Sequence, residues 1–290
     1  VNSWMSVYQG DYYMHTGVQV HELGHNFGLA HSGGLDGLTY TDHTGMMGNP
    51  LYSDDKGKMC YNAAKNWQIG WYEDEDRKEI FYPTDDVNNN IAPNWNQSLT
   101  MVGIADYLNN TSIPVVLKLE TRTGNDYFVG FNRATGVNSD NDQADDMVTI
   151  VRTGSNGNSY SQSYLQGYLE VGEEFQIDDF GGSGTDIIVR LTSIDKTTPV
   201  WKANVWVGTA TTAPPTGPPP VCDSLRVNVL TDNYPEETSW TLTNECSDDV
   251  IKTKPEGSYK DKGTNYLHTY CVPPAEYTFK ISDSYGDGIC

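Results

Sequence analysis

The sequence HELGHNFGLAH, residues 21–31, holds three of the six histidines in this chain of 290 residues. An apolar stripe at helical spacing runs through it at Val20, Leu23 and Phe27, so we expect a helix here. His21 and His25 are four residues apart and project from one face of that helix. Both imidazoles can therefore reach the same metal ion.

A third histidine and an acidic side chain complete the candidate site. Gly28 lets the backbone leave the helix in a conformation that a Cβ atom would penalise, which returns His31 to the metal. Three nitrogen ligands with one open position are typical of catalytic rather than structural zinc. Glu22, beside the first ligand, is the candidate base that takes a proton from water on the metal. An amphipathic helix with surface histidines is the simpler alternative, but it does not explain why three histidines, a glutamate and a glycine all fall in register.

The segment that follows carries a second pattern. Tyr-x-Asp-x-Ser/Thr leading into Met-Gly is matched by Tyr40, Asp42, Thr44, Met47 and Gly48. Residues 21–31 have the form HExxHxxGxxH. Together, the two patterns make the chain resemble the gametolysin-like metalloproteases, a group of metzincins. The resemblance implies that Met47, rather than Met46, is the methionine of the turn beneath the metal. Ordinary core filling is the alternative for either methionine, and His43 is expected to be a loop histidine instead of a fourth ligand.

One more helix is predicted from Asp55 to Gly70, since Met59, Ala63 and Trp67 share a face. The resemblance extends through residues 62–72 and implies that this is the final helix of the catalytic domain. In metzincins most of the sheet and two further helices precede the zinc helix, whereas about twenty residues do so here. We therefore expect residues 1–75 to be the C-terminal part of such a domain, within an internal fragment of a longer secreted precursor. Without that sheet, zinc binding and activity of this piece alone stay open.

Residues 76–208 are predicted to form an antiparallel β-sandwich. Apolar side chains alternate along several short segments that are separated by Gly, Asn, Asp and Ser, and this pattern is typical of such strands. The resemblance extends into this region through residues 129–133 and 161–163. There it implies an accessory role, as a platform beside the catalytic domain.

Two acidic loops are candidates for calcium binding, because hard cations require several oxygen ligands. The first contains Asp140, Asp142, Asp145 and Asp146, and the second is residues 283–288. The spacing in the first loop does not match the EF-hand pattern. Solvated Asp- and Asn-rich loops without an ion are therefore the alternative.

Residues 209–221 are rich in proline and threonine and are predicted to be an extended linker. Beyond it, residues 222–290 hold four of the five cysteines, Cys222, Cys246, Cys271 and Cys290. This density predicts disulfides and an oxidising compartment, since no CxxC pair suggests zinc ligation; the pairing is open among three connectivities. Cys60 either has a partner outside this chain segment or is a buried thiol.

The C-terminal unit resembles a small repeated module of secreted algal proteins that ends in Gly-Asp-Gly-Ile-Cys, as residues 286–290 do. Strands are predicted at residues 225–230, 238–243 and 276–281, which makes this unit a small disulfide-linked β module. An adhesive or targeting role is the natural expectation for it.

The composition limits the partners of the protein. A formal net charge of −21 argues against nucleic acid and against anionic membrane surfaces. No apolar run approaches the length of a membrane span. Sequons at Asn96, Asn109 and Asn110 are compatible with a secreted, extracellular glycoprotein.

The sequence as a whole thus predicts an α+β protein with the zinc helix, Met-turn and final helix of a metzincin, then a β-sandwich and a small β module. The resemblance implies a zinc endopeptidase in which His21, His25 and His31 hold Zn²⁺ and Glu22 transfers protons. It further implies protein or glycoprotein substrates of the cell wall or extracellular matrix. A non-catalytic secreted adhesive or matrix protein with an inactive protease remnant is the alternative. Glu22 argues against that alternative, because a zinc scaffold needs no base.

Overall fold

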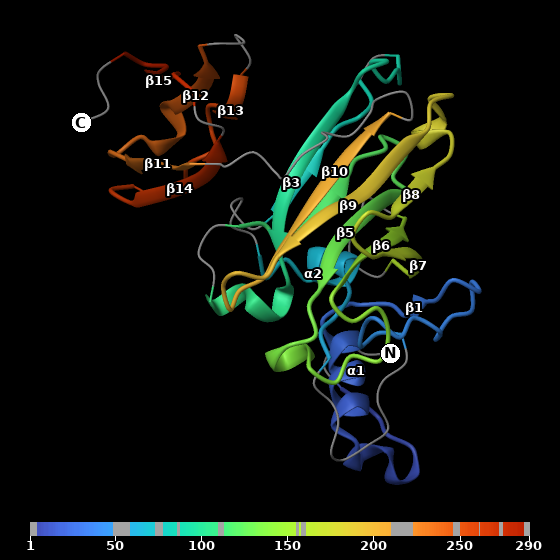
Figure 1. The fold of residues 1–290 in the computed structure, drawn as a ribbon. Coiled ribbons are helices and arrows are strands. Elements are labelled where there is room, and N and C mark those ends of the chain that lie inside the picture. The colour runs from blue at the N-terminus through green and yellow to red at the C-terminus, as the bar shows by residue number, and fades with distance from the viewer. Residues whose placement is uncertain are drawn as a thin grey trace. The chain divides into compact units, whose positions relative to one another are not determined.

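The computed structural model describes residues 5–48, 59–72, 78–85, 88–109, 113–154, 157, 161–209, 223–245, 250–260, 262–272 and 275–286. The chain divides into two compact units, Val1–Pro219 and Pro220–Cys290 (Figure 1). Sheets dominate both, and two α-helices occur among the described residues, so the predicted α+β class is confirmed. Within the described ranges no helix is long and apolar enough to cross a membrane.

The histidine-rich stretch forms helix α1 (Thr16–Asn26), as predicted. Gly28 then adopts a φ of 84°, a left-handed conformation that side chains with a Cβ atom rarely adopt. The chain turns there and continues into the short strand β1 (Ser32–Gly33). The helix and the strand therefore bring residues 21 and 31 to neighbouring positions.

The second helix, α2 (Ala63–Ile69), is shorter than predicted. Asn62 has an extended backbone (φ −67°, ψ 170°), and its side-chain oxygen accepts a hydrogen bond from the Lys65 N–H at 3.0 Å. This N-cap starts the helix at Ala63, so the prediction of a start at Asp55 is wrong for residues 59–62. Residues 49–58 lie outside the described part. The predicted end is confirmed, because Gly70 terminates α2 with a φ of 73°.

Two sheets make up most of the first unit. The first sheet has the order β1-β7-β6-β5-β4-β2, and the second has the order β3-β10-β9-β8. The further strands of the first sheet are β2 (Lys78–Phe81), β4 (Val116–Leu119), β5 (Asp126–Asn132), β6 (Met147–Thr153) and β7 (Ser163–Leu169). Those of the second are β3 (Asn96–Val102), β8 (Glu174–Ile177), β9 (Ile187–Asp195) and β10 (Lys202–Thr209). Short 3₁₀ helices are η1 (Gly10–Met14), η2 (Ile104–Asn109), η3 (Gly136–Asn138), η5 (Phe180–Gly182) and η6 (Pro235–Glu237).

All pairings of the second sheet are antiparallel, but both edges of the first sheet are parallel. Strand β1 runs parallel to β7, and β2 runs parallel to β4. The expectation of a fully antiparallel arrangement is therefore wrong at these edges. The reason is that neither edge strand is joined to its partner by a hairpin: long stretches of chain separate them, and parallel pairing needs such a connection.

The two sheets pack face to face around one core, which is the architecture of a sandwich. The first sheet contributes Leu117, Leu119, Val129, Phe131, Val148 and Ile150. The second contributes Val189, Leu191, Ala203, Val205 and Val207.

Helix α2 covers the other face of the first sheet, where Ala63 and Ala64 share a core with Phe128 and Val151. Gly130 of β5 makes this close approach possible, since a Cβ atom there would lie 3.0 Å from the Cβ of Ala63. The predicted boundary near residue 75 thus falls inside one compact unit of packed layers.

In the second unit, the described residues form five short strands around a small core. Strands β11 (Asp223–Leu230) and β14 (Asn265–Val272) form one sheet, and β12 (Thr238–Asn244), β13 (Val250–Lys254) and β15 (Tyr277–Asp283) form another. In the core, the Trp240 Nε1–H donates to the hydroxyl oxygen of Tyr259 at 2.7 Å. Residues 210–222 and three of the four cysteines, at positions 222, 246 and 290, lie outside the described part, and the side chain of Cys271 is likewise not described. The linker and the disulfides stay predictions.

Candidate metal centre

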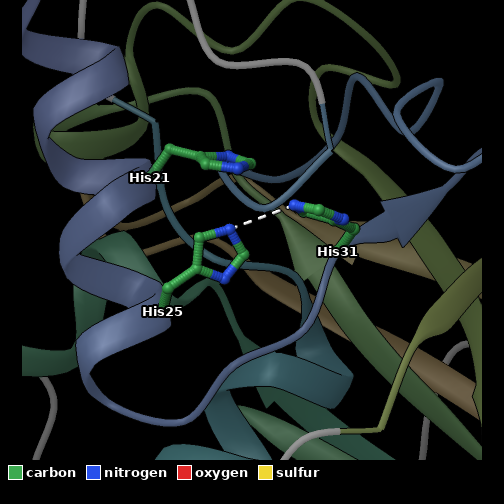
Figure 2. A group of neighbouring side chains, drawn as sticks. All are labelled: His21, His25 and His31. Atoms are coloured by element: carbon green, nitrogen blue, oxygen red, sulfur yellow. Dashed lines mark hydrogen bonds between the residues drawn. The ribbon is translucent and has the colours of Figure 1, made fainter. Parts of the chain in front are cut away.

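Three histidine side chains converge beside α1 (Figure 2). One ring nitrogen from each of His21, His25 and His31 lies within 4.8 Å of the others. The Nε2 atoms of His25 and His31 are 3.0 Å apart. Within the described ranges, this is the one group of three or more His, Cys, Asp or Glu side chains that is close enough to hold a metal ion.

Backbone carbonyl groups fix the orientation of two of these rings. The Nδ1 atom of His21 is 2.8 Å from the carbonyl oxygen of Met46, and that of His25 is 2.8 Å from the carbonyl oxygen of Leu29. A carbonyl oxygen accepts only, so in both rings Nδ1 carries the hydrogen and Nε2 keeps its lone pair. This is the arrangement by which proteins prepare a histidine to bind a metal through Nε2, and the donor set therefore fits zinc.

Burial keeps two of the three imidazoles in their metal-binding protonation state. The pKa of His21 is lowered from 6.5 to about 4, mainly by burial and also by the neighbouring His25, against the opposing effect of the Met46 carbonyl. Burial, with the nearby histidines, also lowers the pKa of His31 to about 4. Both imidazoles are therefore neutral at pH 7, and only the neutral form can coordinate a metal.

The turn around Met47 lies directly beneath α1. Met47 is fully buried, and a Cβ atom at Gly24 would overlap with its Sδ atom and lie 3.2 Å from the ring of Tyr61. Met46, also fully buried, contributes the carbonyl group that orients His21. The sequence resemblance marked Met47 alone. In the structure both methionines contact α1, Met47 through its side chain at Gly24 and Met46 through its carbonyl group at His21.

The other candidates occupy distinct places. Glu22 follows His21 on α1, is half-buried, and forms no hydrogen bond or ion pair with any described residue. His43 does not join the triad; its Nδ1 atom lies 3.4 Å from a carboxylate oxygen of Asp142. Tyr40 was matched to the family pattern without a role, and its ring centroid lies 4.2 Å from that of His31 and 6.4 Å from that of His21.

A buried polar network connects this region to the first sheet. The carboxylate of Asp42, which is fully buried, accepts hydrogen bonds from Thr44 and from Nδ2 of Asn62, the latter at 2.8 Å. Nδ2 of Asn62 also lies 3.1 Å from the Ser32 hydroxyl and 3.4 Å from that of Ser163. Burial raises the pKa of Asp42. Sequence reasoning did not identify Ser32, Asn62 or Ser163, because no local pattern links residues so far apart.

The calcium prediction has no support among the described residues. In the first loop, one carboxylate oxygen of Asp145 accepts from Nδ2 of Asn141 at 2.7 Å, and one of Asp146 binds Arg133 at 2.6 Å. In the second, Asp283 accepts from the backbone N–H groups of residues 285 and 286. Neither loop contributes to a group with metal-binding geometry in the described ranges.

Comparison with known proteins adds one finding. Residues 2–90 match the family model described as Gametolysin peptidase M11, which is 89 of the 290 residues. The matched segment includes the three histidines, Glu22 and Met47. Neither a curated protein nor a solved structure gives a significant match to the chain. Residues 2–90 are therefore similar to the gametolysin-like metallopeptidases, and this match supports a metallopeptidase.

Proposed function

We propose that the protein is a secreted zinc endopeptidase that cleaves proteins or glycoproteins of a cell wall or extracellular matrix. The observation that carries the proposal is the convergence of three imidazole nitrogens, two of them oriented by carbonyl groups of the backbone. Catalytic zinc sites have three protein ligands of this kind and a fourth position for water or substrate.

The residues have separate tasks in this mechanism. His21, His25 and His31 would hold the metal, with the Nε2 atoms of His21 and His25 left free for it by the carbonyl contacts of Nδ1. Zinc, when bound, supplies a Lewis acid that polarises the scissile carbonyl and makes water a better nucleophile. Glu22 accepts the proton of the attacking water and delivers it to the nitrogen of the leaving amine. Met47 packs beneath α1 at Gly24 and so supports the helix that carries His21 and His25.

Secretion and the substrate class rest on other features of the chain. Four cysteines in the last 69 residues favour an oxidising compartment. Sequons at Asn96, Asn109 and Asn110 fit the same location. The resemblance to gametolysin-like enzymes suggests wall or matrix proteins as substrates.

The test combines zinc content with cleavage. The purified protein is expected to bind one zinc ion and to cleave casein or gelatin. Glu22→Gln should retain the metal and lose cleavage by about two to four orders of magnitude, because only the base is removed. Glu170→Gln, which changes an exposed glutamate away from the triad, is the matched control.

Two results would overturn the proposal. Cleavage that survives Glu22→Gln would show that Glu22 is not the base of the reaction. A zinc-loaded protein that cleaves neither substrate would favour the adhesive or matrix function instead.

A further inference from the structure

A cavity of about 310 Å³ lies between the segment after β1 and the strands β6 and β7. Its lining includes Gly34 and Leu35 from the segment, Arg152 from β6, and Tyr164 and Gln166 from β7. This volume is at the lower end of ligand pockets and suits one side chain or one chain end better than a large ligand.

The cavity is close to the metal centre along the chain. Gly34 follows His31 by three residues, and β1 lies between them. An extended chain advances by about 3.4 Å per residue, so the Cα atom of Gly34 lies within about 10 Å of that of His31. A peptide held at the metal would therefore reach the cavity with a residue two or three positions from the scissile bond.

Among the described residues that line the cavity, Arg152 is the one with a charged side chain. It is exposed and forms no ion pair with a described residue, although the chain has 39 acidic and 18 basic side chains. Two other arginines, Arg133 and Arg190, each bind a carboxylate of the chain. The guanidinium of Arg152 is thus available to a ligand.

The neighbouring strands hold this guanidinium in place. Arg152 is paired across the sheet with Tyr127 of β5 and with Tyr164 of β7. Its guanidinium carbon lies 5.6 Å from the centre of the Tyr127 ring, a distance at which a cation is attracted to an aromatic face. An arginine that is restrained in this way loses less conformational entropy when it binds a ligand.

The geometry points to a substrate subsite that selects a carboxylate group, and this inference rests on the proposed peptidase function. The planar guanidinium of Arg152 can donate two parallel hydrogen bonds to one carboxylate group. Leu35, with 56% of its surface exposed, gives the cavity an apolar wall for the methylene groups that carry the carboxylate. The carboxylate comes either from an Asp or Glu side chain or from the C-terminus of the substrate.

The test uses pairs of peptides that differ in one group. One pair has Glu or Gln two or three positions from the cleaved bond, and the other has a free or an amidated C-terminus. Binding is measured by fluorescence anisotropy with the inactive Glu22→Gln variant, and kcat/KM is measured with the active protein. We expect the carboxylate member of one pair to bind about tenfold more tightly, with the preference weakening as salt is added.

Substitutions then assign the preference to the cavity. Arg152→Gln should abolish it, Arg152→Lys should retain part of it, and Arg190→Gln, which removes an arginine of the second sheet, should leave it unchanged. The pair that responds identifies the source of the carboxylate.

Equal binding within both pairs, or a preference that survives Arg152→Gln, would overturn the subsite. Failure of the protein to cleave any peptide would overturn the endopeptidase proposal, and because binding is measured separately the two failures are distinguishable.

Discussion

The backbone N–H of Ser163 donates a hydrogen bond to the carbonyl oxygen of His31 at 3.2 Å. Ser163 begins β7, so the third histidine of the triad is attached directly to the first sheet. The next residue, Ser32, pairs with Ser163 in parallel register, and their hydroxyl oxygens are 2.9 Å apart. We infer that the first sheet positions His31. The sheet is therefore more closely involved in the metal centre than the accessory platform that the sequence resemblance implied.

Asn62→Ala is predicted to destabilise the first unit and to weaken metal binding. The substitution removes the N-cap of α2 and leaves the buried carboxylate of Asp42 without one of its donors. Loss of the cap costs about 1 kcal/mol, and the unsatisfied buried group adds about 1–3 kcal/mol. Urea unfolding gives the free energy, and competition with a zinc chelator gives the affinity.

The exposed Asn94 provides the control for this substitution. Asn94→Ala should change the free energy of unfolding by less than about 0.5 kcal/mol. If Asn62→Ala is equally mild, the polar network does not connect the metal segment to the sheet in the way described above.

Gly24→Ala is predicted to destabilise the protein, although alanine is the better helix former. Its Cβ atom would overlap with the Sδ atom of the buried Met47, so the turn beneath α1 must move. Overpacking of this kind costs about 1–3 kcal/mol. The measurements are the midpoint temperature of thermal unfolding and the affinity for zinc, and both should decrease.

The double variant Gly24→Ala, Met47→Ala tests the contact itself. Met47→Ala alone leaves a cavity, but in the double variant the new methyl group occupies part of it, so the two losses should be less than additive. Strict additivity would show that residues 24 and 47 do not interact.

The sequence predicted those features that depend on neighbouring residues. The register of His21 and His25 on one helical face follows from the spacing of the helix, and the exit at Gly28 follows from the conformational freedom of glycine. The strands of the second unit were also recognisable, since β11, β12 and β15 overlap all three predicted segments. The start of α2 was misjudged because the apolar face continues on the N-terminal side of Asn62, whereas the N-cap at Asn62 makes the helix begin at Ala63.

The features that depend on distant residues were not predictable. Ser32 and Ser163 are 131 positions apart, and Asn62 and Ser163 are 101 positions apart. Their contacts arise only when β1 joins the edge of the first sheet in parallel. The same pairing places Arg152 near the segment that follows His31, so the proposed subsite had no signal in the sequence.

Cys60 is predicted to resist alkylation in the folded protein. Burial raises the pKa of its thiol to about 12, so almost no thiolate is present at pH 8, and the thiolate is the reactive form. Iodoacetamide labelling followed by mass spectrometry of the peptide with Cys60 gives the extent of reaction. Labelling in urea serves as the reference, and comparable rates in the two conditions would contradict the buried thiol.

The metal-free protein is predicted to lose stability between pH 6.5 and pH 4. The pKa of His21 is about 4 in the folded state and 6.5 as the ordinary value, so the unfolded state binds more protons in this interval. Stability therefore rises with pH across the interval and falls on acidification, by about 2–3 kcal/mol for His21. Urea unfolding in the presence of EDTA, at a series of pH values, measures this slope.

His21→Gln separates this effect from the titration of carboxylates. The variant has no imidazole at position 21, so its free energy of unfolding should depend less on pH than that of the wild type between pH 6.5 and pH 4. The carboxylates titrate in both proteins and cancel in the difference. An exposed histidine would give no such difference, because its pKa would be the same in the folded and unfolded states. Parallel curves for the two proteins would thus show that the His21 imidazole is not held neutral by burial beneath the Met46 carbonyl.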